Sequence, residues 1–237
     1  MSYAFLTLVA AGTAALAASG AAAVTIDIDR FAVGFAGTGI VSDSTVGSSA
    51  VTTGPDLLTT GAVRTVSVNL DTRTSGSTGR IEAEIDTDIQ ALSISASDRN
   101  VGTVVLTYDL AALMPLIEQT SGLGVLRYDV RSADTVTRSI TARLNGVQLG
   151  DTFVAANAIN DNEDVVRSFP VTAAPFDFTQ GGSNILTLTM SGGAGLDYSI
   201  GLLQFDLQAQ QVPAPAALGL LGLGLAGLGA IRRRKTG

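Results

Sequence analysis

The stretch "SITARLNGVQLGD", residues 139–151, decides the fold class. Apolar and polar residues alternate along it up to Asn145-Gly146, and the alternation resumes beyond that pair. A period of two places successive side chains on opposite faces of a β-strand. Asn-Gly readily adopts the positive φ angles of a type I′ turn, whose twist suits a two-residue hairpin loop. The stretch therefore predicts two antiparallel strands joined by a tight turn.

The same alternation recurs along much of the chain, and it predicts further half-buried strands. The apolar positions are Val24, Ile26 and Ile28; Val66, Val68 and Leu70; Ile81, Ala83 and Ile85; Leu92, Ile94 and Ala96; Leu106 and Tyr108; Leu126, Tyr128 and Val130; Leu186, Leu188 and Met190; and Leu203, Phe205 and Leu207. The apolar phase slips by one residue before Leu92, which predicts a bulge or turn near Ala91. About ten short strands with Gly, Asn and Ser turns predict an all-β fold, an antiparallel β-sandwich.

Two segments depart from this strand pattern. Residues 36–61 hold 15 Gly, Ser or Thr among 26 positions, so we expect mainly loop there, with a short strand around Val51. In "DLAALMPLIEQ", residues 109–119, apolar side chains recur with helical spacing. That spacing predicts one short helix with Asp109 as a candidate N-cap, and Pro115 limits its length.

The composition of the chain excludes several kinds of chemistry. The 237 residues contain no His and no Cys, so a Ser-His-Asp triad, a thiol nucleophile and a His-based metal site are impossible. Residues 24–211 contain 10 Arg against 21 Asp or Glu, and the sole lysine, Lys235, lies outside them. A domain with a net charge of −11 repels phosphate backbones, so we expect no nucleic-acid partner.

The residue types that remain for catalysis or for sugar stacking fall on unfavourable positions. Glu82 and Glu84 could in principle form an acid/base pair, but the alternation places both on the solvent face of a strand. Tyr108 and Tyr128 fall on the apolar phase, and Trp is absent. We therefore expect both tyrosines in the core, no catalytic residue and no enzymatic activity.

One acidic cluster is a candidate metal site. The stretch "NAINDNEDVV", residues 157–166, is dense in oxygen ligands, and Ca²⁺ binds six to eight oxygens. Its spacing does not match an EF-hand loop. Asn and Asp also populate turns for purely local reasons, so a solvated loop is the alternative. The Ca²⁺ candidates are Asp161, Asn162 and Asp164, and no other cofactor is expected.

The N-terminus predicts export. Residues 4–18 are apolar, and Ala21 and Ala23 supply the small side chains that signal peptidase accepts. Cleavage after Ala23 would remove a signal peptide, residues 1–23, although its first residues contain no Lys or Arg. A buried helix or a permanent anchor is the alternative. Residues 24–211 would then be an extracellular β-sandwich domain.

The C-terminal segment, residues 212–237, has the features of a membrane anchor. Residues 216–231 carry no charge, and a helix of that length covers roughly 24 Å, short of the roughly 30 Å hydrocarbon core of a bilayer. A basic stop-transfer block follows and stays cytoplasmic by the positive-inside rule, so the body lies outside the inner membrane. The block consists of Arg232, Arg233, Arg234 and Lys235.

This tail resembles the C-terminal sorting domains of the PEP-CTERM class, in its VPLPA-CTERM variant. The matching motif is Val212, Pro213, Ala214, Pro215 and Ala216, followed by the apolar span and the basic block. Ala214 departs from the pattern, because the variant has Leu there and the parent class has Glu. The resemblance implies that an exosortase, a membrane protease of Gram-negative bacteria, cuts the tail and delivers the body to the cell surface or extracellular matrix. A plain anchor without processing is the alternative.

The body carries a second, weaker resemblance. The stretches "ARLNGVQLGDTF" and "FDFTQGGSNILTLTMSGGAGLDYSIGLLQFDLQ" resemble the second half of jelly-roll sandwich modules of the carbohydrate-binding type. The matching positions are Asn145, Gly146, Gly182, Asn184 and Leu186.

Together these patterns predict a secreted, surface- or matrix-associated protein with a structural or adhesive role. The alternative is an extracellular polysaccharide-binding module, either assisted by Ca²⁺ or independent of it. Hydrolysis by Glu82 and Glu84 is a third, disfavoured hypothesis.

Overall fold

The computed structural model describes residues 22–210 apart from 38, 47–49, 75, 77–78, 98–99, 156–157, 160–164 and 180–181. The strands are β1 (Ala23–Asp29), β2 (Ile40–Asp43), β3 (Ala50–Leu57), β4 (Val63–Arg73), β5 (Ile81–Asp86), β6 (Ala91–Ala96), β7 (Asn100–Asp109), β8 (Thr120–Ala133), β9 (Arg138–Leu144), β10 (Val147–Gln148), β11 (Phe153–Ala155), β12 (Val165–Val171), β13 (Ile185–Gly192) and β14 (Asp197–Ala209). A 3₁₀ turn, Ala111–Leu113, leads into a short helix, α1 (Met114–Ile117).

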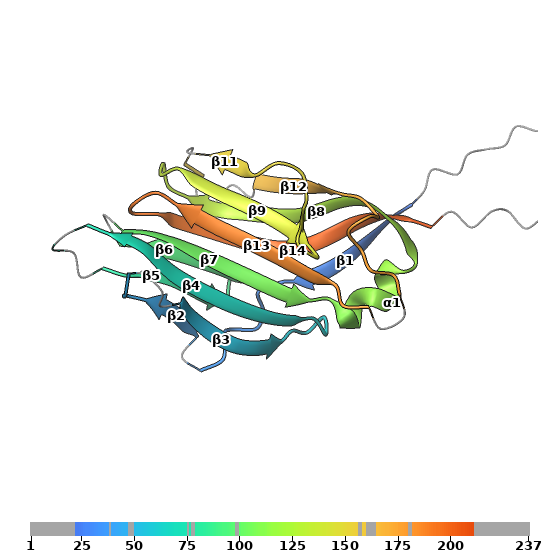
Figure 1. Cartoon of the computed structure of the whole chain (residues 1–237), viewed down its shortest axis with the longest axis horizontal. Coiled ribbons are helices and arrows are strands. Elements are labelled where there is room, and N and C mark those ends of the chain that lie inside the picture. Colours follow the sequence, from blue (N-terminus) through green and yellow to red (C-terminus); the bar gives the residue numbers. More distant parts are fainter. Residues whose placement is uncertain are drawn as a thin grey trace, which may run out of the picture.

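These strands form two sheets that pack face to face (Figure 1). In the described part of the chain, sheet A has the order β12-β8-β14-β6-β5-β2, with β1 also paired to β14. Sheet B has the order β10-β9-β13-β7-β4-β3, with β11 also paired to β9. The paired strands run antiparallel, so the predicted antiparallel β-sandwich with one short helix is confirmed.

The predicted apolar faces of the strands form the core. The alternating apolar positions are buried except Val24, which is half-buried, and Val147 of the opening hairpin, which is exposed. The phase slip near Ala91 is a turn, because β5 ends at Asp86 and β6 begins at Ala91 after Gln90, whose φ is 52°. The Asn145-Gly146 hairpin is also confirmed, with φ angles of 50° and 80° at its two turn residues.

The helical segment forms as predicted but is very short. The carboxylate of Asp109 accepts a hydrogen bond from the Ala111 N–H at 2.9 Å, at the start of the 3₁₀ turn. Pro115 lies in the first turn of α1, where its missing N–H costs nothing. The buried residues of the segment are Leu110, Leu113, Met114 and Ile117.

The prediction that residues 36–61 are mainly loop was wrong. The segment contains β2 as well as β3, which extends well beyond Val51. Both strands lie at sheet edges, where pairing on one side suffices and apolar alternation is not required. A buried carboxylate anchors the end of β2, because Asp43 accepts a hydrogen bond from the Leu70 N–H of β4 at 2.9 Å. An edge position also tolerates Pro55 within β3.

A buried ionic cluster joins the two sheets. Arg64 of β4 is fully buried, and its guanidinium contacts the carboxylate of Asp29 at 2.7 Å and that of Asp56 at 3.4 Å. The Tyr108 hydroxyl of β7 donates a second hydrogen bond to Asp29 at 3.0 Å. Arg64 also donates to the Val33 carbonyl at 2.8 Å, which holds the segment after β1. Burial raises the pKa of Asp29, and the attraction of Arg64 only partly offsets this effect.

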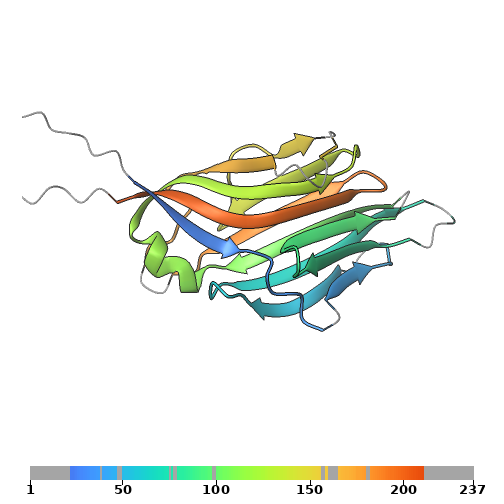
Figure 2. The ribbon, with the colours of Figure 1, turned by 180° about the vertical axis from the view of Figure 1, so that it is seen from behind.

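Both ends of the described chain leave the sandwich at one end (Figures 1 and 2). The Ala209 N–H donates to the Ala22 carbonyl at 2.8 Å, and the Gln210 N–H donates to the Gln119 carbonyl at 3.1 Å, beside α1. We call this end, which includes α1 and residues 172–179, the terminal pole. The opposite end, where β14 begins at Asp197, is the distal pole. A strand of this length separates the poles by roughly 40 Å.

Replacing Arg64 by Met should destabilise the protein by about 3–5 kcal/mol, because Asp29 and Asp56 would remain buried without their cation. Chemical denaturation measures the free energy of unfolding. Arg127→Met is the matched control, since the Arg127–Asp206 pair is partly exposed and should contribute about 1 kcal/mol or less. Equal losses for the two variants would contradict the structural role of the Arg64 cluster.

Candidate functional site

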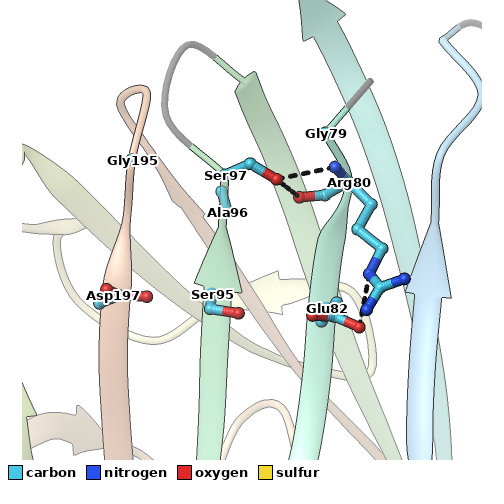
Figure 3. Close-up of a pocket in the computed structure, with 8 residues that line it drawn as sticks. All are labelled: Gly79, Arg80, Glu82, Ser95, Ala96, Ser97, Gly195 and Asp197. Carbon is cyan, nitrogen blue, oxygen red and sulfur yellow. Dashed lines mark hydrogen bonds and ion pairs between the residues drawn. The ribbon is translucent and has the colours of Figure 1, made fainter. Parts of the chain in front are cut away.

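The distal pole contains an open hollow of about 530 Å³ (Figure 3). We call it the distal hollow. The polar residues that line it come from β5, β6, β14 and the loop segments next to them. They are Arg80, Glu82, Ser95, Ser97 and Asp197.

The register of sheet A places three of these side chains in one row. Glu82 of β5 pairs with Ser95 of β6, and Ser95 pairs with Asp197 of β14. Directly paired residues share one face of a sheet, and neighbouring strands lie about 4.8 Å apart. A hydroxyl group therefore stands between two carboxylates on the outer face of the sheet, as Figure 3 shows.

The rim of the distal hollow is fixed by contacts of Arg80. Its Nε lies 2.7 Å from Oε1 of Glu82 in an ion pair that solvent reaches. Ser97 accepts a hydrogen bond from the Arg80 N–H at 2.9 Å and donates one to the Arg80 carbonyl at 3.0 Å. A Cβ at Gly79 would lie 2.2 Å from Nδ2 of Asn100, so this close approach requires glycine.

The distal hollow is lined by charged and hydrogen-bonding groups. It offers a guanidinium, two carboxylates and two hydroxyls on an open surface. Glu82 is in an ion pair, and Glu84 lies in the next row, opposite Ser93. The predicted solvent-side position of Glu82 and Glu84 is confirmed, since Glu82 is half-buried and Glu84 exposed.

The tyrosines lie in the core, as predicted. Tyr108 and Tyr128 are buried, and burial raises the pKa of both phenols, so they remain neutral. Tyr198, on β14, is buried as well. None of the three is available as a surface platform for a sugar ring.

Asn145 and Asn184, two positions of the jelly-roll resemblance, contact each other at the terminal pole. Nδ2 of Asn145 donates to Oδ1 of Asn184 at 3.0 Å. Asn184 is buried, and it exchanges hydrogen bonds of 2.8 Å with the backbone of Asp177, accepting from the N–H and donating to the carbonyl. These residues therefore organise the segment that precedes β13 and do not form an open site.

A second polar cluster lies on the outer face of sheet A. Asp206 accepts hydrogen bonds from Arg127 at 2.9 Å, from Thr25 at 2.8 Å and from Gln204 at 3.0 Å. Burial disfavours ionisation of Asp206, but the hydrogen bonds from Arg127 and Thr25 outweigh it, so its pKa lies below the ordinary value.

Several predicted site residues lie outside the described residues. They are Ala21, Asp161, Asn162, Asp164, Val212, Pro213, Ala214, Pro215, Ala216, Arg232, Arg233, Arg234 and Lys235. Ala23 is the first residue of β1. In the described ranges, no group of three or more Asp, Glu, His or Cys is placed to hold a metal ion. Nor does that part of the chain contain a helix long and apolar enough to cross a membrane.

Comparison with protein families identifies the tail. The model of the PEP-CTERM protein-sorting motif matches residues 211–235. The chain therefore carries this motif, as the sequence resemblance predicted. The motif implies export, a membrane-anchored sorting signal and processing by an exosortase.

Solved structures similar to the body include two carbohydrate-binding modules. One is TmCBM27, a carbohydrate-binding module that specifically recognises mannan. It is 18% identical to this chain, the match covers 54% of this chain and 80% of that one, and the TM-score is 0.31. The other is the xylan-binding module CBM15, which is 12% identical to this chain. The match covers 80% of this chain and 99% of that one, and the TM-score is 0.38. Comparison with curated proteins found no match.

Replacing Asp206 by Asn should lower the free energy of unfolding by about 1 kcal/mol at neutral pH. The pKa of Asp206 is lowered in the folded state. Its contribution to the free energy of unfolding is therefore present above the unfolded pKa of about 3.9 and is lost as pH falls through the folded pKa. Urea unfolding at pH 7 and in acid should therefore show the two proteins converging in acid. A difference that does not change with pH would contradict the assignment.

Proposed function

We propose that the protein is a structural or adhesive component of the surface or extracellular matrix of a Gram-negative bacterium. One observation carries this proposal. The sorting motif at residues 211–235 follows directly after β14, which ends at Ala209 and runs from the distal pole. A chain held at its tail therefore presents the distal hollow away from the membrane.

The distal hollow is the surface that we expect to contact the matrix. Its row of Glu82, Ser95 and Asp197 offers acceptors and a hydroxyl, and Arg80 adds donors at the rim. Sugar hydroxyls both donate and accept hydrogen bonds, so this mixture favours an exopolysaccharide as the partner. Polysaccharide binding is the second candidate function. In that case the polysaccharide would be the ligand to which the protein adheres.

We further propose that the body is not an enzyme and that signal peptidase removes residues 1–23. The absence of His and Cys, together with the exposed ion pair of Glu82, supports the first part.

Calcium binding through Asp161, Asn162 and Asp164 stays a hypothesis. A rise in melting temperature with millimolar Ca²⁺ would support it.

Replacing Ser95 by Trp should weaken retention on the host's own exopolysaccharide, because an indole would fill the centre of the distal hollow. Trp is favoured in strands, so the fold should tolerate the change. The matched control is Ser93→Trp, since Ser93 is half-buried on the same strand and face but pairs with Glu84 outside the hollow. Affinity chromatography of the wild type and both variants measures the effect.

We expect the wild type and Ser93→Trp to be retained. The apparent dissociation constant of Ser95→Trp should be at least about tenfold higher, the equivalent of a lost charge-assisted hydrogen bond. Equal elution of Ser93→Trp and Ser95→Trp would contradict the role of the hollow. A wild type that is not retained would contradict polysaccharide binding.

A further inference from the structure

The terminal pole exposes apolar side chains around the point where the chain leaves the sandwich. Leu116 of α1 is 47% exposed, Leu123 of β8 is 42% exposed, and Phe178 is 41% exposed. We call these three residues the apolar rim. Exposed large hydrophobic side chains that gather at one place on a protein mark a surface that contacts a partner or a membrane.

The core fixes Leu116 and Phe178 in these exposed positions. Met114 and Ile117 are buried, and on so short a helix this orientation leaves Leu116 facing outward. The ring of Phe178 lies 5.5 Å from that of Phe176, which packs edge-on against buried Phe205 at 5.7 Å. Leu116 and Phe178 therefore cannot withdraw into the core without breaking native packing.

Phe178 of the apolar rim lies next to the last described residue, Gln210. A hollow of about 360 Å³ is lined by both Phe178 and Gln210, together with Glu118, Thr120 and Ser121. A Cβ at Gly122 would lie 3.1 Å from Cζ of Phe178, which places that ring beside the residue that precedes Leu123.

The chain that follows is short. Five residues separate Gln210 from Ala216, where the predicted membrane span of the sorting motif begins. Even fully extended, that segment spans only about 20 Å. Because the motif is a membrane-anchored sorting signal, the terminal pole is confined to the immediate neighbourhood of the bilayer until the tail is cut.

We infer that the apolar rim docks onto the lipid surface beside the anchor. Leu116, Leu123 and Phe178 enter the interfacial region, where aromatic and aliphatic side chains are favoured. The charged neighbours of the rim in sequence, Glu118 and Asp177, are acidic, so attraction to anionic headgroups does not drive the contact. The docked body stands on the membrane with its distal pole outward. This inference rests on the membrane anchoring in the proposed function.

The absence of Trp from the chain allows a direct test. Full-length protein carrying Phe178→Trp is reconstituted into phosphatidylcholine vesicles whose acyl chains are brominated. We expect its fluorescence to shift to shorter wavelength and to be largely quenched by the bromines. Val154→Trp is the matched control, because Val154 is also exposed, at 61%, but lies on β11 away from the terminal pole. Its fluorescence should remain at longer wavelength and unquenched.

A second variant checks that the rim causes the contact. Adding Leu116→Ser and Leu123→Ser to Phe178→Trp should remove the quenching while the protein still floats with the vesicles. Equal quenching of Phe178→Trp and Val154→Trp in protein that floats would overturn the docking but leave the anchoring intact. Protein that does not float with the vesicles would contradict both the anchoring and the docking.

Discussion

The contact between Arg64 and Asp29 is the interaction on which the arrangement of the sandwich depends. It joins β4 of sheet B to the end of β1 in sheet A, with both charged groups buried. An unpaired charge at this depth would be strongly unfavourable, so β1 is held in one position. That position sets β1 against β14 and brings Ala22 beside Ala209. The pairing of β1 with β14 then places both chain ends at the same pole, and the buried ion pair fixes the opposite end of β1.

Because both chain ends leave at the terminal pole, the two poles of the sandwich differ in their distance from the sorting motif. The sorting motif begins two residues after Ala209, so the membrane-anchored end of the chain and the terminal pole coincide. The distal hollow lies at the opposite end of β14, where Glu82, Ser95 and Asp197 form a polar row on sheet A. In our proposal, the terminal pole serves attachment and the distal pole serves contact with the matrix.

Local patterns could be predicted from the sequence, and long-range register could not. Alternation identified the strands of the core, and the Asn145-Gly146 turn and the sorting motif are each encoded within a few neighbouring residues. Asp29 instead falls on the polar phase of β1, and a register shift between Asp27 and Asp29 turns it inward to Arg64. The distal hollow was missed for a related reason. Glu82 and Asp197 are far apart in sequence, and only strand pairing through Ser95 brings them together.

In our proposal, the tail is a temporary anchor for a surface-displayed sandwich. The most direct test is the intact mass of the protein isolated from its host and from a strain that lacks the exosortase. We predict that the host form ends before the basic block, so Arg232–Lys235 are absent, and that the deletion strain retains them. A mature protein from the unmodified host that still contains Arg234 would contradict the account.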